Sequence, residues 1–247
     1  MNLKHLTLTA FVCITGSAMA QFTGQIATNM SSGGAAQGAT AGAISTLLGP
    51  VTDANAKRSF NLEEFQGSPY TSNTFKPTQL LYKEEDMGTV FYRYNALNEE
   101  IEIKQSLLEE GIRALGRDKN IAILVDGNPM SFKTFIDRNN NTLNGYLSVL
   151  AEGPNFTLYK RIRVKFTEGA PAANSFVKAT PSRFAQFEEY YVQKAGVNRI
   201  DELDQRKGAI YRLDPARKDA IKAYLKENNL DVKDQADLVR IIQFLNQ

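Results

Sequence analysis

The chain has 247 residues, with 29 lysines and arginines against 27 aspartates and glutamates, and with one histidine and one cysteine. A formal net charge of +2 gives no bulk attraction to nucleic acid or to an anionic lipid surface, so we expect no nucleic-acid partner. A chain of this length can bury a sizeable core without disulfides.

The first 20 residues have the pattern of a secretory signal peptide. Lys4 gives a positive start, residues 6–14 are apolar, and Ala18-Met19-Ala20 is a small-x-small cleavage site. We therefore expect export to the periplasm or the cell surface. Cleavage would remove His5 and Cys13. The mature chain would then have no imidazole or thiol group, and many enzymes depend on one or the other. No later apolar run reaches the about 18 residues of a membrane-spanning helix, so we expect none in the mature chain.

An uncharged leader is expected at residues 21–59. Residues 21–52 contain no aspartate, glutamate, lysine or arginine, and Gly, Ala, Ser and Thr are frequent there. Because this composition buries too little apolar area to offset the ordering of the backbone, it favours a largely flexible segment. The alternative is a close contact between helices through the small-xxx-small spacing of Gly34, Gly38 and Gly42.

Residues 60–196 have the alternating pattern of an antiparallel β domain. Strands are expected in short runs separated by polar turns, at 79–82, 90–94, 101–103, 121–125, 131–136, 145–150, 156–166 and 184–192. In the best-defined hairpin residues 95–98 form the loop, and Arg93 then faces Glu100. Successive strands of this kind predict an antiparallel meander, either a curled sheet or a small sandwich.

Residues 197–247 change to a helical period. Asp214-Pro215 is typical of a helix start, and Asn228-Asn229 of a helix end. A second helix is expected after Asp231, with its apolar positions at helical spacing: Leu238, Ile241, Ile242 and Leu245. Short helices with narrow apolar stripes are not stable alone, so we expect these two to pack on the sheet. The predicted fold class is α+β.

Several short motifs are spread over residues 67–246. They are Gly67-Ser68-Pro69-Tyr70, Arg93-Tyr94-Asn95-Ala96, Tyr159-Lys160-Arg161, Lys165-Phe166-x-Glu168-Gly169-x-Pro171-Ala172, Tyr190-Tyr191 and Asp237-Leu238-Val239. In combination they resemble a family of exported, signal-peptide-bearing proteins from Bacteroidota. The resemblance implies a periplasmic or surface location. It implies no catalytic residue, because the family carries no established activity.

Two motifs of metal sites and enzymes are better explained by turns and loops. Asp137-x-Asn139-x-Asn141 matches the first ligands of an EF-hand loop, but Thr142 stands where that loop needs glycine. A hairpin turn is the better interpretation. Ser175-x-x-Lys178 fits a nucleophile motif whose partner motifs are missing from the sequence. We therefore expect no catalytic residue, metal ligand or cofactor.

Glu100 and Glu102 offer the one enzymatic alternative. Two residues apart on one strand, their carboxylates would lie about 7 Å apart, within the broad range that glycosidases use. Exposed structural glutamates are commoner, and a neighbouring Arg93 would lower a pKa that an acid catalyst needs raised. The alternative function is a carboxylate-dependent hydrolase acting on an envelope glycan.

One predicted strand carries a row of cations. Tyr159, Arg161, Arg163 and Lys165 alternate along it and share one face. Carboxylates of neighbouring strands, such as Glu100 or Glu102, or simply solvent would explain the row structurally. As a binding site, the cations would hold carboxylate, sulfate or phosphate, and Tyr159 would stack on a sugar ring.

The sequence as a whole favours an exported, non-catalytic binding or interaction protein of the cell envelope. Its partner would be another envelope protein or an anionic glycan. Nothing in the sequence indicates an oligomeric state.

Overall fold

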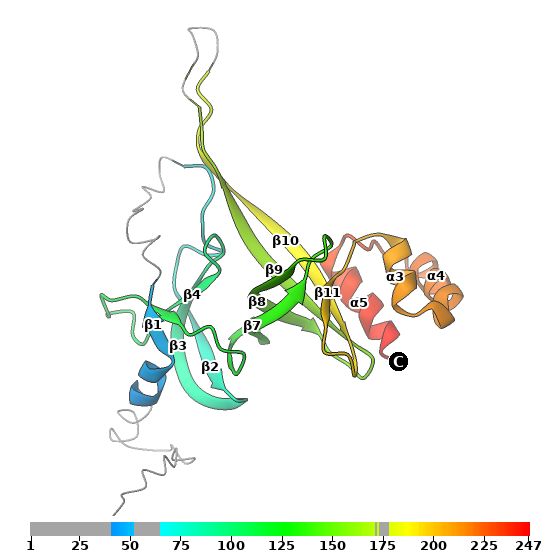
Figure 1. The fold of residues 1–247 in the computed structure, drawn as a ribbon, viewed down its shortest axis with the longest axis horizontal. Helices are drawn as coiled ribbons and strands as arrows, with labels where there is room; N and C mark the ends of the chain where they lie inside the picture. Colours follow the sequence, from blue (N-terminus) through cyan, green and yellow to red (C-terminus); the bar gives the residue numbers. More distant parts are fainter. Residues whose placement is uncertain (1–40, 52–64, 171, 173–177) are drawn as a thin grey trace, which may run out of the picture.

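The computed structural model describes residues 41–51, 65–170, 172 and 178–247. Among these residues, 11 strands form one sheet, and helices follow it at the C-terminal end (Figure 1). The strands are β1 (Leu48–Pro50), β2 (Lys76–Tyr82), β3 (Glu85–Asn95), β4 (Glu100–Lys104), β5 (Arg113–Leu115), β6 (Ile121–Val125), β7 (Asn128–Ile136), β8 (Thr142–Ala151), β9 (Phe156–Thr167), β10 (Arg183–Lys194) and β11 (Ile200–Glu202). The C-terminal helices are α3 (Lys207–Leu213), a 3-10 turn (Pro215–Arg217), α4 (Lys218–Glu227) and α5 (Gln235–Leu245). The α+β prediction is confirmed.

The last five strands close into a ring. The sheet order is β1-β5-β4-β3-β2-β6-β7-β11-β10-β9-β8, and β8 pairs back onto β7. The pairs are antiparallel except β7–β11, which is parallel and has a single bridged pair, Asp201 and Ile136. Because side chains alternate across a strand, each strand of the ring contributes one residue to a small shared core. These residues are Phe135, Leu147, Tyr159, Tyr191 and Ile200.

The C-terminal helices cover the outer face of the ring, as expected. Phe156 and Leu158 of β9 and Val192 of β10 share one buried cluster with the apolar faces of the three α-helices. The four apolar positions predicted for the last helix are all buried in α5. The predicted cap Asp231 is wrong, because Asp234 takes this role and its side chain accepts a hydrogen bond from the Asp237 backbone N–H at 2.9 Å.

The β9–β10 hairpin extends beyond the ring toward the N-terminal strands (Figure 1). On this outer half, Val164 and Phe184 are buried in the cluster of the N-terminal sheet. Phe65 lies 5.8 Å from Phe184 and 5.9 Å from Phe166 between ring centroids. One long hairpin thus connects the two parts of the molecule. Its opposite face is free to carry polar side chains.

The β3–β4 hairpin exists, but its predicted register is wrong by two residues. Arg93 pairs with Glu102 instead of Glu100. The Asn95 side-chain oxygen accepts hydrogen bonds from the backbone N–H groups of Leu97 at 3.2 Å and Asn98 at 3.1 Å. Asn95 therefore stays at the end of β3 and the turn starts one residue later. Because the shift is even, every side chain keeps its predicted face.

Part of the predicted leader belongs to the fold, which corrects the expected start of the β domain at residue 60. Residues 41–46 are helical, β1 pairs with β5, and Ile44 is buried. The Arg113 guanidinium donates to the backbone oxygens of Ser45 at 3.0 Å and Leu48 at 3.4 Å. Gly34, Gly38 and the predicted signal peptide lie outside the described residues. No helix in the described part of the chain is long and apolar enough to cross a membrane.

Candidate functional site

The four residues of the predicted cation row share one face of β9 but lie at different depths. Tyr159 is buried inside the ring, where its hydroxyl donates to Gln193 at 2.9 Å. Arg161 is also buried, Arg163 is half-buried, and Lys165 is exposed. Tyr159 therefore has no free face on which a sugar could stack. The row runs outward from the interior of the ring.

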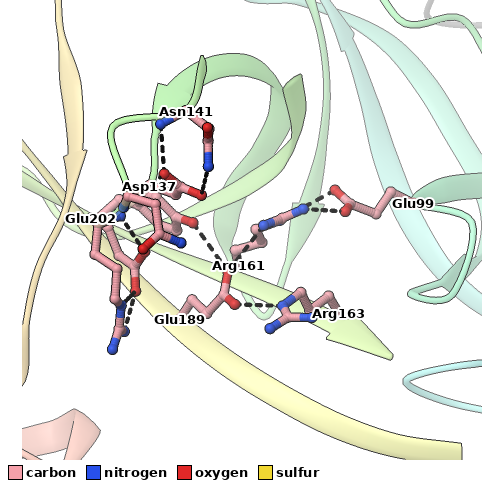
Figure 2. A network of polar contacts seen from close by, with 10 residues as sticks. Glu99, Asp137, Asn141, Arg161, Arg163, Glu189 and Glu202 are labelled. Carbon is pink, nitrogen blue, oxygen red and sulfur yellow. Dashed lines mark hydrogen bonds and ion pairs between the residues drawn. The ribbon is translucent and has the colours of Figure 1, made fainter. Parts of the chain in front are cut away.

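Arg161 lies between two carboxylates at the mouth of the ring (Figure 2). Its guanidinium donates to both oxygens of Glu99 and, at 3.0 Å, to Glu189. Glu189 stands directly opposite Arg161 across the β9–β10 pair and also accepts from Arg163 at 2.5 Å. The row is thus partly explained by internal ion pairs, but its partners are Glu99 and Glu189 instead of Glu100 or Glu102.

Glu189 is held in its ionised form. Burial would raise the pKa of its carboxyl, but hydrogen bonds and positive charge from Arg163 and Arg161 outweigh burial, and the pKa lies below its usual value. The Tyr191 hydroxyl donates to the same carboxylate at 3.1 Å. A general acid needs the opposite change in pKa, so Glu189 is suited to binding a cation and unsuited to donating a proton.

Glu99 reaches Arg161 from the N-terminal half of the sheet. It ends the β3–β4 turn with a positive φ of 51°. Its carboxylate lies against Gly145 of β8, where an added Cβ atom would overlap the carboxylate oxygen. Glycine at this position therefore makes room for the Glu99–Arg161 ion pair, which joins the N-terminal sheet to the ring.

A hollow of about 590 Å³ opens beside this network. Charged side chains dominate its wall: Asp137, Arg138, Arg161, Arg163, Glu188, Glu189 and Glu202. The Arg138 guanidinium is paired with Glu202. Three cations against four carboxylates give no net attraction for an anion. The hollow is therefore a site of internal charge pairing and not an anion pocket.

The turn beside this hollow confirms the interpretation of the EF-hand-like motif. The Asp137 carboxylate accepts from the backbone N–H groups of Asn139 at 2.9 Å and Asn141 at 2.7 Å. It also accepts from the Asn141 side chain at 2.9 Å, and these hydrogen bonds lower the pKa of Asp137. The motif forms a hairpin turn between β7 and β8. The described residues contain no cluster of three or more acidic, histidine or cysteine side chains arranged for a metal ion.

Farther out on the same face lie Arg163, whose carboxylate partner is Glu189, and two exposed cations. Arg163 stands opposite Phe187, with its guanidinium 5.1 Å from the ring centroid. Beyond it, Lys165 of β9 and Arg183 of β10 are both exposed, and neither forms an ion pair within the described part of the chain. We call Arg163, Lys165, Arg183 and Phe187 the cationic strip. Phe187 is 41% exposed, so the strip combines positive charge with an accessible aromatic ring.

The two glutamates of the enzymatic alternative are buried, although exposed glutamates were expected. Glu102 is 2% exposed and bonds to Arg93 at 2.5 Å. The same guanidinium lies 3.8 Å from the centroid of the Tyr70 ring. This carboxylate is therefore paired with a cation that itself lies against an aromatic ring. Its contacts fit a structural role. Ser175 of the nucleophile motif lies outside the described residues.

The network residues missed by the sequence analysis are Glu99 and Glu189. The signal for Glu189 was the alternation of the strand predicted at 184–192, which would place a glutamate opposite Arg161 and a tyrosine opposite Tyr159. The connection between the two strands is long, so the sequence does not fix which residues of the two strands face each other. No protein-family model, curated protein or solved structure matches the chain. Any functional proposal therefore rests on the geometry of the described residues.

Proposed function

We propose that this chain is an exported, non-catalytic binding protein of the cell envelope, and that the cationic strip binds an anionic glycan. The observation that carries this proposal is the lack of carboxylate partners for Lys165 and Arg183 beside the exposed ring of Phe187, in the part of the chain that the structure describes. Like charges in neighbouring positions repel each other unless an anion lies near them. A polymer with regularly placed carboxylates would supply that anion.

The geometry of the strip suits an extended ligand. Residues two apart on a strand are separated by about 6.6 Å, so the cations are spaced along the hairpin and do not converge on one point. The apolar side of the hairpin packs on the N-terminal sheet, which leaves the strip side facing solvent. An aromatic ring such as that of Phe187 can pack against the apolar face of a sugar unit. Export and membership of the Bacteroidota family remain proposals that rest on the N-terminal pattern and the motifs.

The test compares two triple variants that remove the same charge. R163Q/K165Q/R183Q neutralises the strip, and K207Q/K218Q/K226Q removes three exposed lysines from the helices. The wild type should bind polygalacturonate more tightly at low salt than at high salt, because exposed charges are screened. The strip variant should lose at least about tenfold in affinity, and the helix variant less than about threefold.

Equal affinity of the two variants, or no binding of polygalacturonate by the wild type, would contradict the proposal. Dextran, which is uncharged, is the control polymer and should not bind measurably. Release of reducing sugar ends from polygalacturonate by the wild type would instead support the hydrolase. The pairing of Glu102 with Arg93 and the lowered pKa of Glu189 speak against that activity.

A further inference from the structure

A second hollow of about 470 Å³ lies where β7 and β11 diverge. These two strands share only one bridged pair, so the ring is loosely closed at this point. Its lining includes Lys119, Phe132, Lys133, Asn198 and Arg199. Three of the lining residues are cations and none is a carboxylate, in contrast to the hollow beside Arg161.

Lys133 is the central cation of this hollow. It is half-buried, its ammonium lies 5.5 Å from the centroid of the Tyr159 ring, and it forms no ion pair among the described residues. Burial lowers the pKa of Lys133, and the negative charge of Glu152 opposes this change only in part. A buried charge without a paired anion is costly, so an anion bound beside Lys133 would be favoured.

The other side chains fit the remaining surface of a sugar. Lys119 is exposed at the rim, and Arg199 is held there by Asp201 at 2.7 Å. Asn198 is exposed and offers a polar group for a sugar hydroxyl, and the partly buried ring of Phe132 lines another part of the hollow, where it could contact the C–H face of the sugar. The volume is large enough for one sugar unit.

We propose that this hollow binds the carboxylate-bearing terminal unit of an acidic glycan, with Lys133 and Lys119 facing the carboxylate. The proposal rests on the proposed glycan-binding function for its ligand class, but it concerns a different surface. The hollow would recognise one charged sugar unit. The cationic strip would hold the extended chain.

The experiment measures binding of the monosaccharide galacturonate to the full chain, with galactose as the uncharged control. Calorimetry should show millimolar binding of galacturonate and at least about tenfold weaker binding of galactose, since a charged hydrogen bond is lost. K133M should weaken galacturonate binding by about tenfold or more, K119Q by less, and K133R should restore part of it. The strip variant R163Q/K165Q/R183Q should bind galacturonate like the wild type.

The outcomes separate the two proposals. If galacturonate does not bind, or binds no better than galactose, the terminal-sugar proposal is wrong whatever the polymer does. Unchanged galacturonate affinity in both K133M and K119Q also overturns it. If K133M fails to fold, K133Q takes its place: galacturonate affinities equal to the wild type in both K133Q and K119Q count against the proposal. Loss of polymer binding in the strip variant with normal galacturonate binding supports both sites.

Discussion

At the residue scale, burial decides which cations of β9 are structural and which are free to bind. Arg161 is 8% exposed and is neutralised by two carboxylates, whereas Lys165 is exposed and has no ion-pair partner in the described part of the chain. Two positions along one strand therefore have opposite surroundings, although the residue types alone look alike. Removing a buried guanidinium that is paired with two carboxylates costs folding free energy, because each carboxylate loses a partner.

The first prediction concerns Arg161. Replacing it with methionine keeps most of the side-chain volume but leaves Glu99 and Glu189 without this partner, so we expect the free energy of unfolding to fall by about 3–5 kcal/mol. R163Q is the matched control two residues away. Its side chain is 40% exposed, so that variant should lose only about 0–1 kcal/mol. Urea denaturation of both variants measures the difference, and similar losses would show that the Arg161 network adds no special stability.

At the element scale, one asparagine attaches the last helix to the ring. Asn246, which follows α5, accepts hydrogen bonds from the backbone N–H groups of Asn155 at 3.0 Å and Phe156 at 2.7 Å. Its amide donates back to the Phe156 carbonyl at 2.9 Å. The side chain thus pairs with the start of β9 much as a neighbouring strand would. It fixes the helix over the buried cluster that both elements share.

The second prediction concerns this attachment. N246A removes three hydrogen bonds at the partly buried start of β9, so we expect a loss of about 2 kcal/mol in the free energy of unfolding. N228A is the control, because that side chain makes one exposed bond to the Tyr224 carbonyl at 3.0 Å. It should cost about 0.5 kcal/mol or less. Thermal or urea unfolding compares the two, and an equal effect would contradict the attachment.

The sequence allowed strands and helices to be predicted more reliably than the pairing of strands with one another. Alternation is local, so the strands expected at 121–125 and 131–136, which lie in β6 and β7, and the buried face of α5 were predicted correctly. The register of β3 and β4 was missed because it depends on how the Asn95 side chain folds back on the turn. The hollow at Lys133 was also missed, because it arises where two strands distant in sequence diverge.

At the scale of the whole molecule, the sheet is continuous from the segment at residues 41–51 to the ring. β1 forms one end of the strand order, and the ring closes the other. The Glu99–Arg161 ion pair and the packing of Val164 and Phe184 hold the N-terminal sheet against the β9–β10 hairpin. Both proposed binding surfaces lie on the ring or on its long hairpin. The hollow at Lys133 also depends on the pairing of β6 with β7 and on the position of Lys119, which precedes β6.

The third prediction tests whether residues 41–51 are part of the cooperative fold. A chain that begins at residue 52 loses the buried Ile44 side chain, the pairing of β1 with β5, and the hydrogen bonds that Arg113 donates to Ser45 and Leu48. Burial of one isoleucine is worth about 1.5–3 kcal/mol and each net hydrogen bond about 1 kcal/mol, so we expect a loss of about 3 kcal/mol or more.

The matched control for this truncation is a chain that begins at residue 41, which keeps each of these contacts and should unfold at the same urea concentration as the longer chain. Urea unfolding midpoints of the two truncated chains give the comparison. Equal midpoints would show that β1 only lies against the sheet edge without stabilising it. A lower midpoint for the chain from residue 52, with galacturonate binding retained, would show that the ring keeps its structure when the far end of the sheet is removed.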